Sequence, residues 1–238
     1  MRFFKYVLKL IDPLFYAREG LSASFTPPFI HATAMNLAVK KALNIDPEEQ
    51  PFLLAGDKGN RNIPKYRNSL VSDDYYFTPA RIISNLRYFT EITKGENDGY
   101  IFKTGMGEPF QAGILNYITP ETEFEGFLML RGEMEFPEMI RLGSFRGKAK
   151  LTLVESKSSS MVKRLVSISH PVDPLVTPVK RGVMINMFPY PVVENVLHDT
   201  AVKVLFDKER FPSYLSIPES WELPEDEHIK IGKKAAVI

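Results

Sequence analysis

A short basic stretch is the part of this sequence best suited to chemistry with a polyanion. Long cationic side chains form ion pairs with phosphates, and a flat ring can stack on a nucleic-acid base. Ten residues supply four such cations and one ring: Arg141, Phe145, Arg146, Lys148 and Lys150. We therefore predict a contact with a nucleic-acid backbone, with Phe145 stacked on a base. The alternatives are a solvated charged turn and a Phe145 ring that fills its own loop.

The residues around this stretch predict a turn followed by a strand. From 148 to 153 polar and apolar residues alternate, which is typical of a strand with one face on a core. Lys148 and Lys150 fall on the polar side. Gly143 and Gly147 allow the backbone before the strand to turn sharply and to approach a bulky partner closely.

Composition makes any polyanion site a local one. The chain of 238 residues has a formal net charge of only +1, so bulk electrostatics do not favour nucleic acid. Residues 140–164, however, contain seven Lys and Arg and a single acid, Glu155. Hydrophobic residues make up 44% of the chain and charged residues 25%, which is ordinary for a globular protein.

Several classes of site and location are disfavoured. The absence of cysteine excludes disulfides, thiolate metal sites and cysteine nucleophiles. Adjacent acids at 73–74 and 225–227 have no histidine at ligand spacing, so we expect no metal and no other cofactor. No apolar run approaches the ~18 residues of a membrane helix. The apolar start is interrupted by Lys5 and Lys9 and lacks a small-residue cleavage site, so we expect a cytoplasmic protein without a membrane partner.

Hydrophobic periodicity predicts an α+β fold dominated by strands. Residues 3–11 alternate as a first strand, and Thr26 before Pro27 and Pro28 predicts the start of a helix that runs to about Leu43. A short helix is possible over 133–139. Further strands are expected over 75–84, 85–93, 99–103, 123–131, 148–154, 161–169, 181–188, 192–198 and 201–206.

Four stretches occur in the order found in a known family. They are LIDPLFYAREG (10–20), PPFIHATAMNLAV (27–39), YYFTPARIIS (75–84) and IRLGSFRGKAKL (140–151). Over roughly residues 3–190 the chain resembles Csc-one, the Cas-five-type, backbone-capping subunit of subtype I-D CRISPR surveillance (Cascade) complexes, a member of the RAMP superfamily. The resemblance implies a ferredoxin-like (RRM-type) β-α-β-β-α-β antiparallel core with long loops and a β-rich C-terminal elaboration. It implies a single RAMP-type domain over 1–238, with a core of about 1–190 and an extension over 191–238.

The resemblance also implies a role in antiviral defence. We expect this protein to be non-catalytic. Proteins of the family bind the 5′ handle of the CRISPR RNA beside the backbone subunit and the large subunit. They lie near the protospacer-adjacent motif of the target DNA. The resemblance assigns RNA contact to the loop after Ile140. Tyr16 and Arg18 after the first strand, and Arg81, are further candidates for RNA contact; the alternative is packing beneath the following loop.

A different class of function depends on a histidine. Some relatives in the superfamily cleave precursor RNA through acid–base attack by a 2′-hydroxyl, which requires a group that titrates near neutrality. His31, predicted in the first helical turn, is the residue that a metal-independent endoribonuclease of this kind would use. No partner for His31 is evident in the sequence, so polar packing and an RNA contact are its alternative roles.

Overall fold

A strongly curved antiparallel sheet organises the chain. The computed structural model describes residues 1–16, 23–45, 72, 74–94, 112–187, 191–207 and 209–221. Its elements are β1 (Arg2–Leu10), β2 (Ala23–Phe25), β3 (Phe29–Ile30), α1 (Ala32–Ala42), β4 (Tyr75–Phe77), β5 (Ala80–Ile82), β6 (Tyr88–Lys94), β7 (Ala112–Ile118), β8 (Glu123–Leu130), β9 (Met139–Leu142), β10 (Gly147–Ser167), β11 (Arg181–Ile185), β12 (Val192–Phe206) and β13 (Ser213–Leu215).

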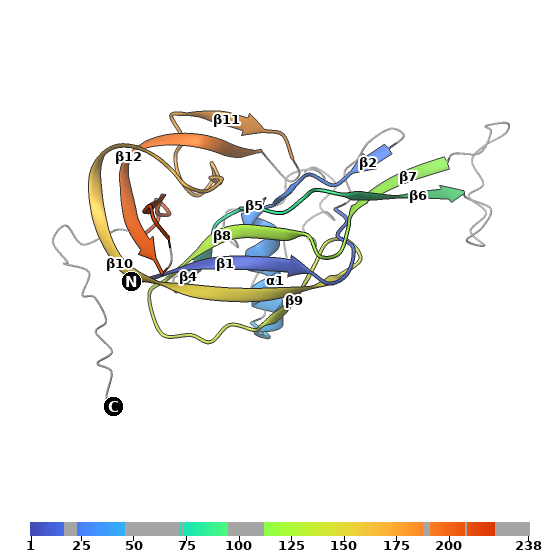
Figure 1. Ribbon diagram of the computed structural model, residues 1–238, viewed down its shortest axis with the longest axis horizontal. Helices are drawn as coiled ribbons and strands as arrows, with labels where there is room; N and C mark the ends of the chain where they lie inside the picture. Colours follow the sequence, from blue (N-terminus) through green and yellow to red (C-terminus); the bar gives the residue numbers. More distant parts are fainter. Residues whose placement is uncertain are drawn as a thin grey trace, which may run out of the picture.

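The main sheet has the strand order β11-β12-β10-β1-β8-β5-β3, and β13, β4 and β9 pair with β12, β8 and β10. β10 and β12 curl away from the centre, so the sheet forms a half-barrel (Figure 1). A second sheet, β2-β7-β6, extends from the end of the main sheet where β1 finishes (Figure 1). The predicted antiparallel, β-dominated class is confirmed at this level.

The helical part of the prediction needs correction. The described residues contain one helix, so the β-α-β-β-α-β order implied by the resemblance is not established. The short helix considered over 133–139 is wrong, because residues 131–138 are irregular and lead directly into β9. The strand expected over 99–103 lies outside the described residues.

α1 begins later than predicted. His31, not Thr26, is its N-cap, and the His31 ring accepts a hydrogen bond from the Thr33 amide at 3.1 Å. The hydroxyl of Thr26 instead donates to the Asn116 carbonyl of β7 at 2.9 Å, so Thr26 is bonded to a strand and lies outside the helix. The predicted end is confirmed: Leu43 is the C-cap, and Asn44 after it has a φ of +55°.

The first core lies between α1 and one face of the main sheet. Phe4, Tyr6, Leu8 and Leu10 of β1 point to this face, as the alternation of β1 predicted. Tyr6 is fully buried and donates a hydrogen bond to the Thr78 carbonyl at 2.7 Å. Its ring occupies the space beside Gly126, where a Cβ atom would lie 2.5 Å from the ring.

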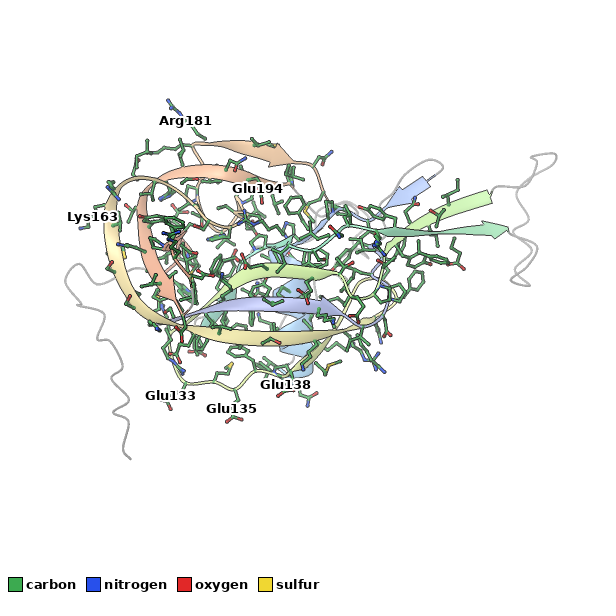
Figure 2. All side chains as sticks on the ribbon, viewed as in Figure 1. Glu133, Glu135, Glu138, Lys163, Arg181 and Glu194 are labelled. Carbon is green, nitrogen blue, oxygen red and sulfur yellow. The ribbon has the colours of Figure 1, made fainter. Side chains whose placement is uncertain are left out.

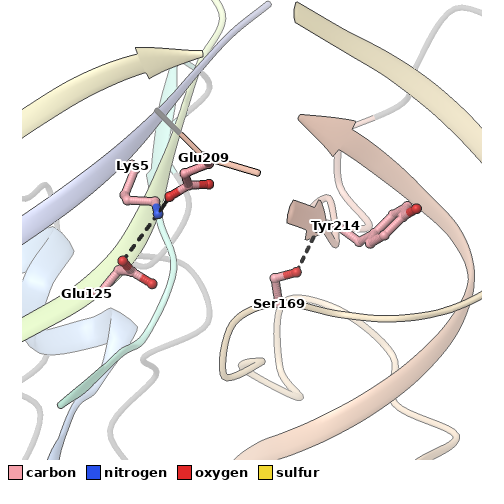
Figure 3. A network of polar contacts seen from close by, with 5 residues as sticks. All are labelled: Lys5, Glu125, Ser169, Glu209 and Tyr214. Carbon is pink, nitrogen blue, oxygen red and sulfur yellow. Dashed lines mark hydrogen bonds and ion pairs between the residues drawn. The ribbon is translucent and has the colours of Figure 1, made fainter. Parts of the chain in front are cut away.

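The C-terminal segments cover part of the opposite face. Phe3, Phe127, Phe206 and Trp221 form a second core there, and the Trp221 indole donates to the Ser72 carbonyl at 3.2 Å. Trp221 therefore packs within this chain. Figure 3 shows the polar edge of this region, where Lys5 forms ion pairs with Glu125 and Glu209 and the Tyr214 amide bonds to Ser169.

No helix among the described residues is long and apolar enough to cross a membrane.

Candidate nucleic-acid interface

The predicted basic loop is the turn of the β9–β10 hairpin. β9 and β10 pair with Leu142 opposite Gly147 and Arg141 opposite Lys148, so residues 143–146 form the turn between them. The turn packs on the segment that follows β1. The Ser144 amide donates to the Phe15 carbonyl at 2.7 Å, and the Lys148 amide donates to the Asp12 carboxylate at 2.9 Å.

Gly143 is required by this packing. Its φ is +75°, and a Cβ atom there would lie 2.5 Å from the Phe15 carbonyl oxygen. A Cβ atom at Gly147 would lie 2.9 Å from the Pro13 carbonyl oxygen. The close backbone approach predicted from these glycines is therefore made by the chain's own 13–15 segment.

We expect Gly143→Ala to lower the free energy of unfolding by about 1–2 kcal/mol, because alanine is strained in the left-handed region and its methyl group would collide with Phe15. Chemical denaturation would measure the change. Gly132→Ala is the matched control, since no atom lies within 4 Å of a Cβ there. Equal stabilities of the two variants would contradict this role for Gly143.

The strand alternation places the cations on the face opposite α1. Ala149 and Leu151 pack in the core on the α1 side, so Lys148 and Lys150 point away from it and are exposed. Arg141 lies beside Lys148 on β9, and Lys9 lies beside Lys150 on β1. Three adjacent strands and the turn therefore present one basic cluster: Lys9, Arg141, Arg146, Lys148 and Lys150.

Four of the five charges of the basic cluster are available to a ligand. Among the described residues, no ion pair involves Arg141, Arg146, Lys148 or Lys150. The Arg141 guanidinium donates to the Arg146 carbonyl at 3.2 Å, which ties the strand to the turn. Lys9 contacts Glu121 at 2.5 Å, and this contact raises the pKa of Lys9. A shallow hollow lined by Met139, Ile140, Arg141 and Lys148 opens beside the cluster.

The Phe145 ring packs against two other aromatic rings. Its ring centroid lies 5.5 Å from that of Phe15, at an interplanar angle of 28°, and 5.9 Å from that of Tyr117. Phe145 is nevertheless 63% exposed, so one part of the ring remains open to solvent. Packing against the loop and stacking on a base are therefore compatible roles for this ring.

The other predicted contact residues do not join the cluster. Tyr16 is half-buried against the first core, and its hydroxyl is buried without a partner among the described residues. Burial raises the pKa of Tyr16. Arg18 lies outside the described residues. Arg81 lies on β5, opposite Glu125 of β8. β8 lies between β5 and β1, so two strand spacings, about 10 Å along the sheet, separate the strand of Arg81 from that of Lys9.

The remaining cations of the basic stretch are also distant. Lys163 lies at the far, curled end of β10 (Figure 2). The 15 residues between Lys148 and Lys163 correspond to about 50 Å of strand. Lys157 is paired with Asp207 at 2.7 Å. Only part of the local positive charge counted in the sequence therefore belongs to one surface.

The structure gives His31 a structural role. It is 2% exposed, and its Nδ1 accepts the hydrogen bond from the Thr33 amide that caps α1. A buried capping ring is poorly placed to take a proton from an RNA hydroxyl. Within the described part of the chain, no group of three or more His, Asp and Glu side chains could hold a metal ion.

Comparison with known families decides the family of the chain. The family model described as type I-D CRISPR-associated protein Cas5/Csc1 matches residues 1–229. The chain belongs to this family. The resemblance seen in four short stretches is thus confirmed, and the Cas5/Csc1 match extends past residue 190 through β12 and β13. Membership of a type I-D family implies participation in a multi-subunit CRISPR complex. A search of curated proteins found no match.

Sequence reasoning missed several residues at this surface. Lys9 was assigned to the first strand but not to the site, and Phe15, Phe89 and Tyr117 were not selected as candidates. The only sequence signal for Lys9 is its place on the polar side of β1, which matches that of Lys150 on β10. Their proximity depends on the pairing of β1 with β10, which no local pattern predicts.

Proposed function

We propose that this protein is a non-catalytic, CRISPR RNA-binding subunit of a type I-D interference (Cascade) complex. In this proposal the basic cluster holds the phosphates of the guide's 5′ handle. The observation that carries the proposal is the exposure of Arg141, Arg146, Lys148 and Lys150 on one surface, without ion pairs among the described residues. Clustered cations of this kind bind a nucleic-acid backbone by releasing its counterions.

The proposal includes partners and a location. Beside the RNA handle lie the backbone subunit and the large subunit of the complex, and the target DNA near its protospacer-adjacent motif. The site of action is the cytoplasm. These assignments rest on family membership.

We also infer a single RAMP-type domain with a ferredoxin-like core. The strand order β10-β1-β8-β5, all antiparallel, matches the 4-1-3-2 order of that fold, and α1 follows the first strand as the fold requires. The irregular residues 131–138 take the place of the second helix. β10 supports a single domain, because one continuous strand pairs with β1 and then with β12.

A salt series tests the RNA site. We expect the variant with Arg141, Arg146 and Lys148 all changed to Ala to bind a labelled RNA with a 5′ handle more weakly. The slope of log affinity against log salt should become shallower by about 2, since each lost phosphate contact on single-stranded RNA removes ~0.7. Gel shifts in EDTA across the salt series would measure both quantities.

The chain offers a charge-matched control. Changing Lys163, Arg164 and Arg181 to Ala removes three positive charges from exposed residues of β10 and β11, far from the turn. This control variant should keep the wild-type slope. Equal slopes for both triple variants would contradict the assignment of the RNA backbone to the basic cluster.

The same assay addresses the alternative, a metal-independent endoribonuclease that processes precursor CRISPR RNA. The burial of His31 does not favour this activity. We expect the RNA to remain intact in EDTA. Cleavage by the wild type that disappears in His31→Ala would overturn the non-catalytic assignment.

A further inference from the structure

Four aromatic rings continue from the turn of the β9–β10 hairpin onto the second sheet. Phe145 contacts Phe15 and Tyr117, whose centroids are 5.1 Å apart, and Tyr117 contacts Phe89 at 6.1 Å. We call Phe145, Phe15, Tyr117 and Phe89 the aromatic row. They come from four separate segments of the chain: the turn, the residues after β1, and strands β7 and β6.

Backbone pairing holds the aromatic row in place. Leu14 and Ile118 exchange two hydrogen bonds of 2.9 Å, which fasten the segment after β1 to the end of β7. The Ser144 amide fastens the turn to Phe15 on the other side. Phe89 and Tyr117 are directly opposite each other in the β6–β7 pair. The basic cluster and the second sheet are thus joined through residues 12–15.

The two inner rings of the aromatic row are buried and the two outer rings are exposed. Phe15 is 4% exposed and Tyr117 9%, whereas Phe145 is 63% exposed and Phe89 56%. Tyr117 is held by a hydrogen bond from its hydroxyl to Glu91 at 2.7 Å, and burial together with this bond raises the pKa of Tyr117 to about 12. Two fixed, buried rings therefore support two rings that remain open to a ligand.

We propose that Phe145 and Phe89 are a stacking platform for unpaired bases, supported from beneath by Phe15 and Tyr117. The inference rests on the proposed function, because the RNA backbone has to follow the basic cluster for its bases to reach the row. Phe145 and Phe89 each lie about 6 Å from Tyr117, so their centroids are no more than about 12 Å apart. Two or three consecutive nucleotides span such a distance, as they do on other sheet platforms that stack bases on aromatic side chains.

Charge orients the RNA strand across this platform. Arg146 follows Phe145 directly in the turn, and Arg141 and Lys148 lie behind it, so phosphates are attracted to the hairpin side. Glu91 on β6 is exposed and bonded to Tyr117, so it repels phosphates from the part of the second sheet beside Tyr117. The backbone therefore follows the hairpin while the bases point toward the aromatic row.

The affinity of the protein for single-stranded RNA tests the platform. Phe89→Leu and Phe145→Leu should each weaken binding of single-stranded handle RNA by about tenfold, since one stacked base contributes that order of affinity. Neither change removes a charge, so the salt slope should remain that of the wild type. Phe211→Leu is the matched control, because Phe211 is 74% exposed and lies outside the row. RNA with abasic sites should bind the wild type and both platform variants equally.

Fluorescence provides a readout independent of affinity. The chain has one tryptophan, Trp221, which is 4% exposed in the second core. Phe89→Trp therefore adds a single exposed indole to the platform, and its emission should be quenched when the handle RNA stacks on it. Phe211→Trp should show no comparable quenching.

The outcomes separate this inference from the proposed function. The RNA site is supported if the variant with Arg141, Arg146 and Lys148 changed to Ala has a shallower salt slope. The platform is overturned if, in the same experiments, Phe89→Leu and Phe145→Leu bind RNA with unchanged affinity and Phe89→Trp shows no quenching. Absence of salt-dependent RNA binding by the wild type overturns both. Tenfold losses restricted to RNA with bases support the platform.

Discussion

Asn36→Leu is expected to lower the free energy of unfolding by about 3–4 kcal/mol. Asn36 is 1% exposed in α1, and its side chain pairs with the edge of β4 as a neighbouring strand would. Its Nδ2 donates to the Phe77 carbonyl at 2.9 Å and to the Ala32 carbonyl at 2.8 Å, and its Oδ1 accepts from the Phe77 amide at 3.0 Å. Leucine has a similar volume but would leave both buried Phe77 groups without these partners, at about 1–3 kcal/mol each.

Urea denaturation of the folded chain measures this effect. Lys41→Leu is the control on the same helix, because Lys41 is exposed and its replacement should change the stability by no more than about 0.5 kcal/mol. Asn36→Asp should be at least as destabilising at neutral pH as Asn36→Leu, since it keeps the acceptor for the Phe77 amide but buries a carboxylate against the Ala32 and Phe77 carbonyl oxygens. A stability of Asn36→Leu equal to that of Lys41→Leu would show that Asn36 does not connect α1 to β4.

Acid should destabilise the fold through His170. This histidine is 3% exposed; its Nδ1 lies 2.7 Å from the Pro171 carbonyl and its Nε2 lies 3.3 Å from the Ser216 amide. The Ser216 amide is a donor, so Nε2 has to be an unprotonated acceptor and the ring is neutral. Burial is the main reason that the pKa of His170 falls from 6.5 to about 4; the positive charge of Arg81 acts in the same direction, and the hydrogen bond to the Pro171 carbonyl opposes the shift.

The pH window follows from this lowered pKa. Between about pH 6.5 and pH 4 the unfolded chain binds a proton at His170 that the folded chain does not. Stability from the neutral ring is therefore complete above pH 6.5 and is lost as the pH falls toward 4, by about 2 kcal/mol at pH 5.

The comparison is the change in unfolding free energy between pH 7 and pH 5. His170→Gln should show about 2 kcal/mol less change over this interval than the wild type. His198→Gln, at a histidine that is only partly buried, should behave as the wild type does. If His170→Gln retained the full pH dependence, the acid sensitivity would belong to other groups.

The sequence alone determined the local features of the site. Alternation along residues 3–11 and 148–153 predicted which side chains of β1 and β10 are buried, because each strand places successive residues on opposite faces. Gly143 indicated a turn with a close backbone contact, since few other residues adopt its φ. Four short stretches were enough to predict the family that the match over residues 1–229 confirms.

Only the tertiary structure decided which of these features meet. Lys9 reaches the basic cluster because β1 pairs with β10, whereas β8 separates Arg81 on β5 from β1. The helix starts at Ala32 because Thr26 bonds to a strand 90 residues later, which outweighs the Thr-Pro-Pro signal. The aromatic row joins residues 15, 89, 117 and 145. Strand pairing and ring contacts over such separations depend on the whole chain, whereas periodicity and turn chemistry depend only on neighbours.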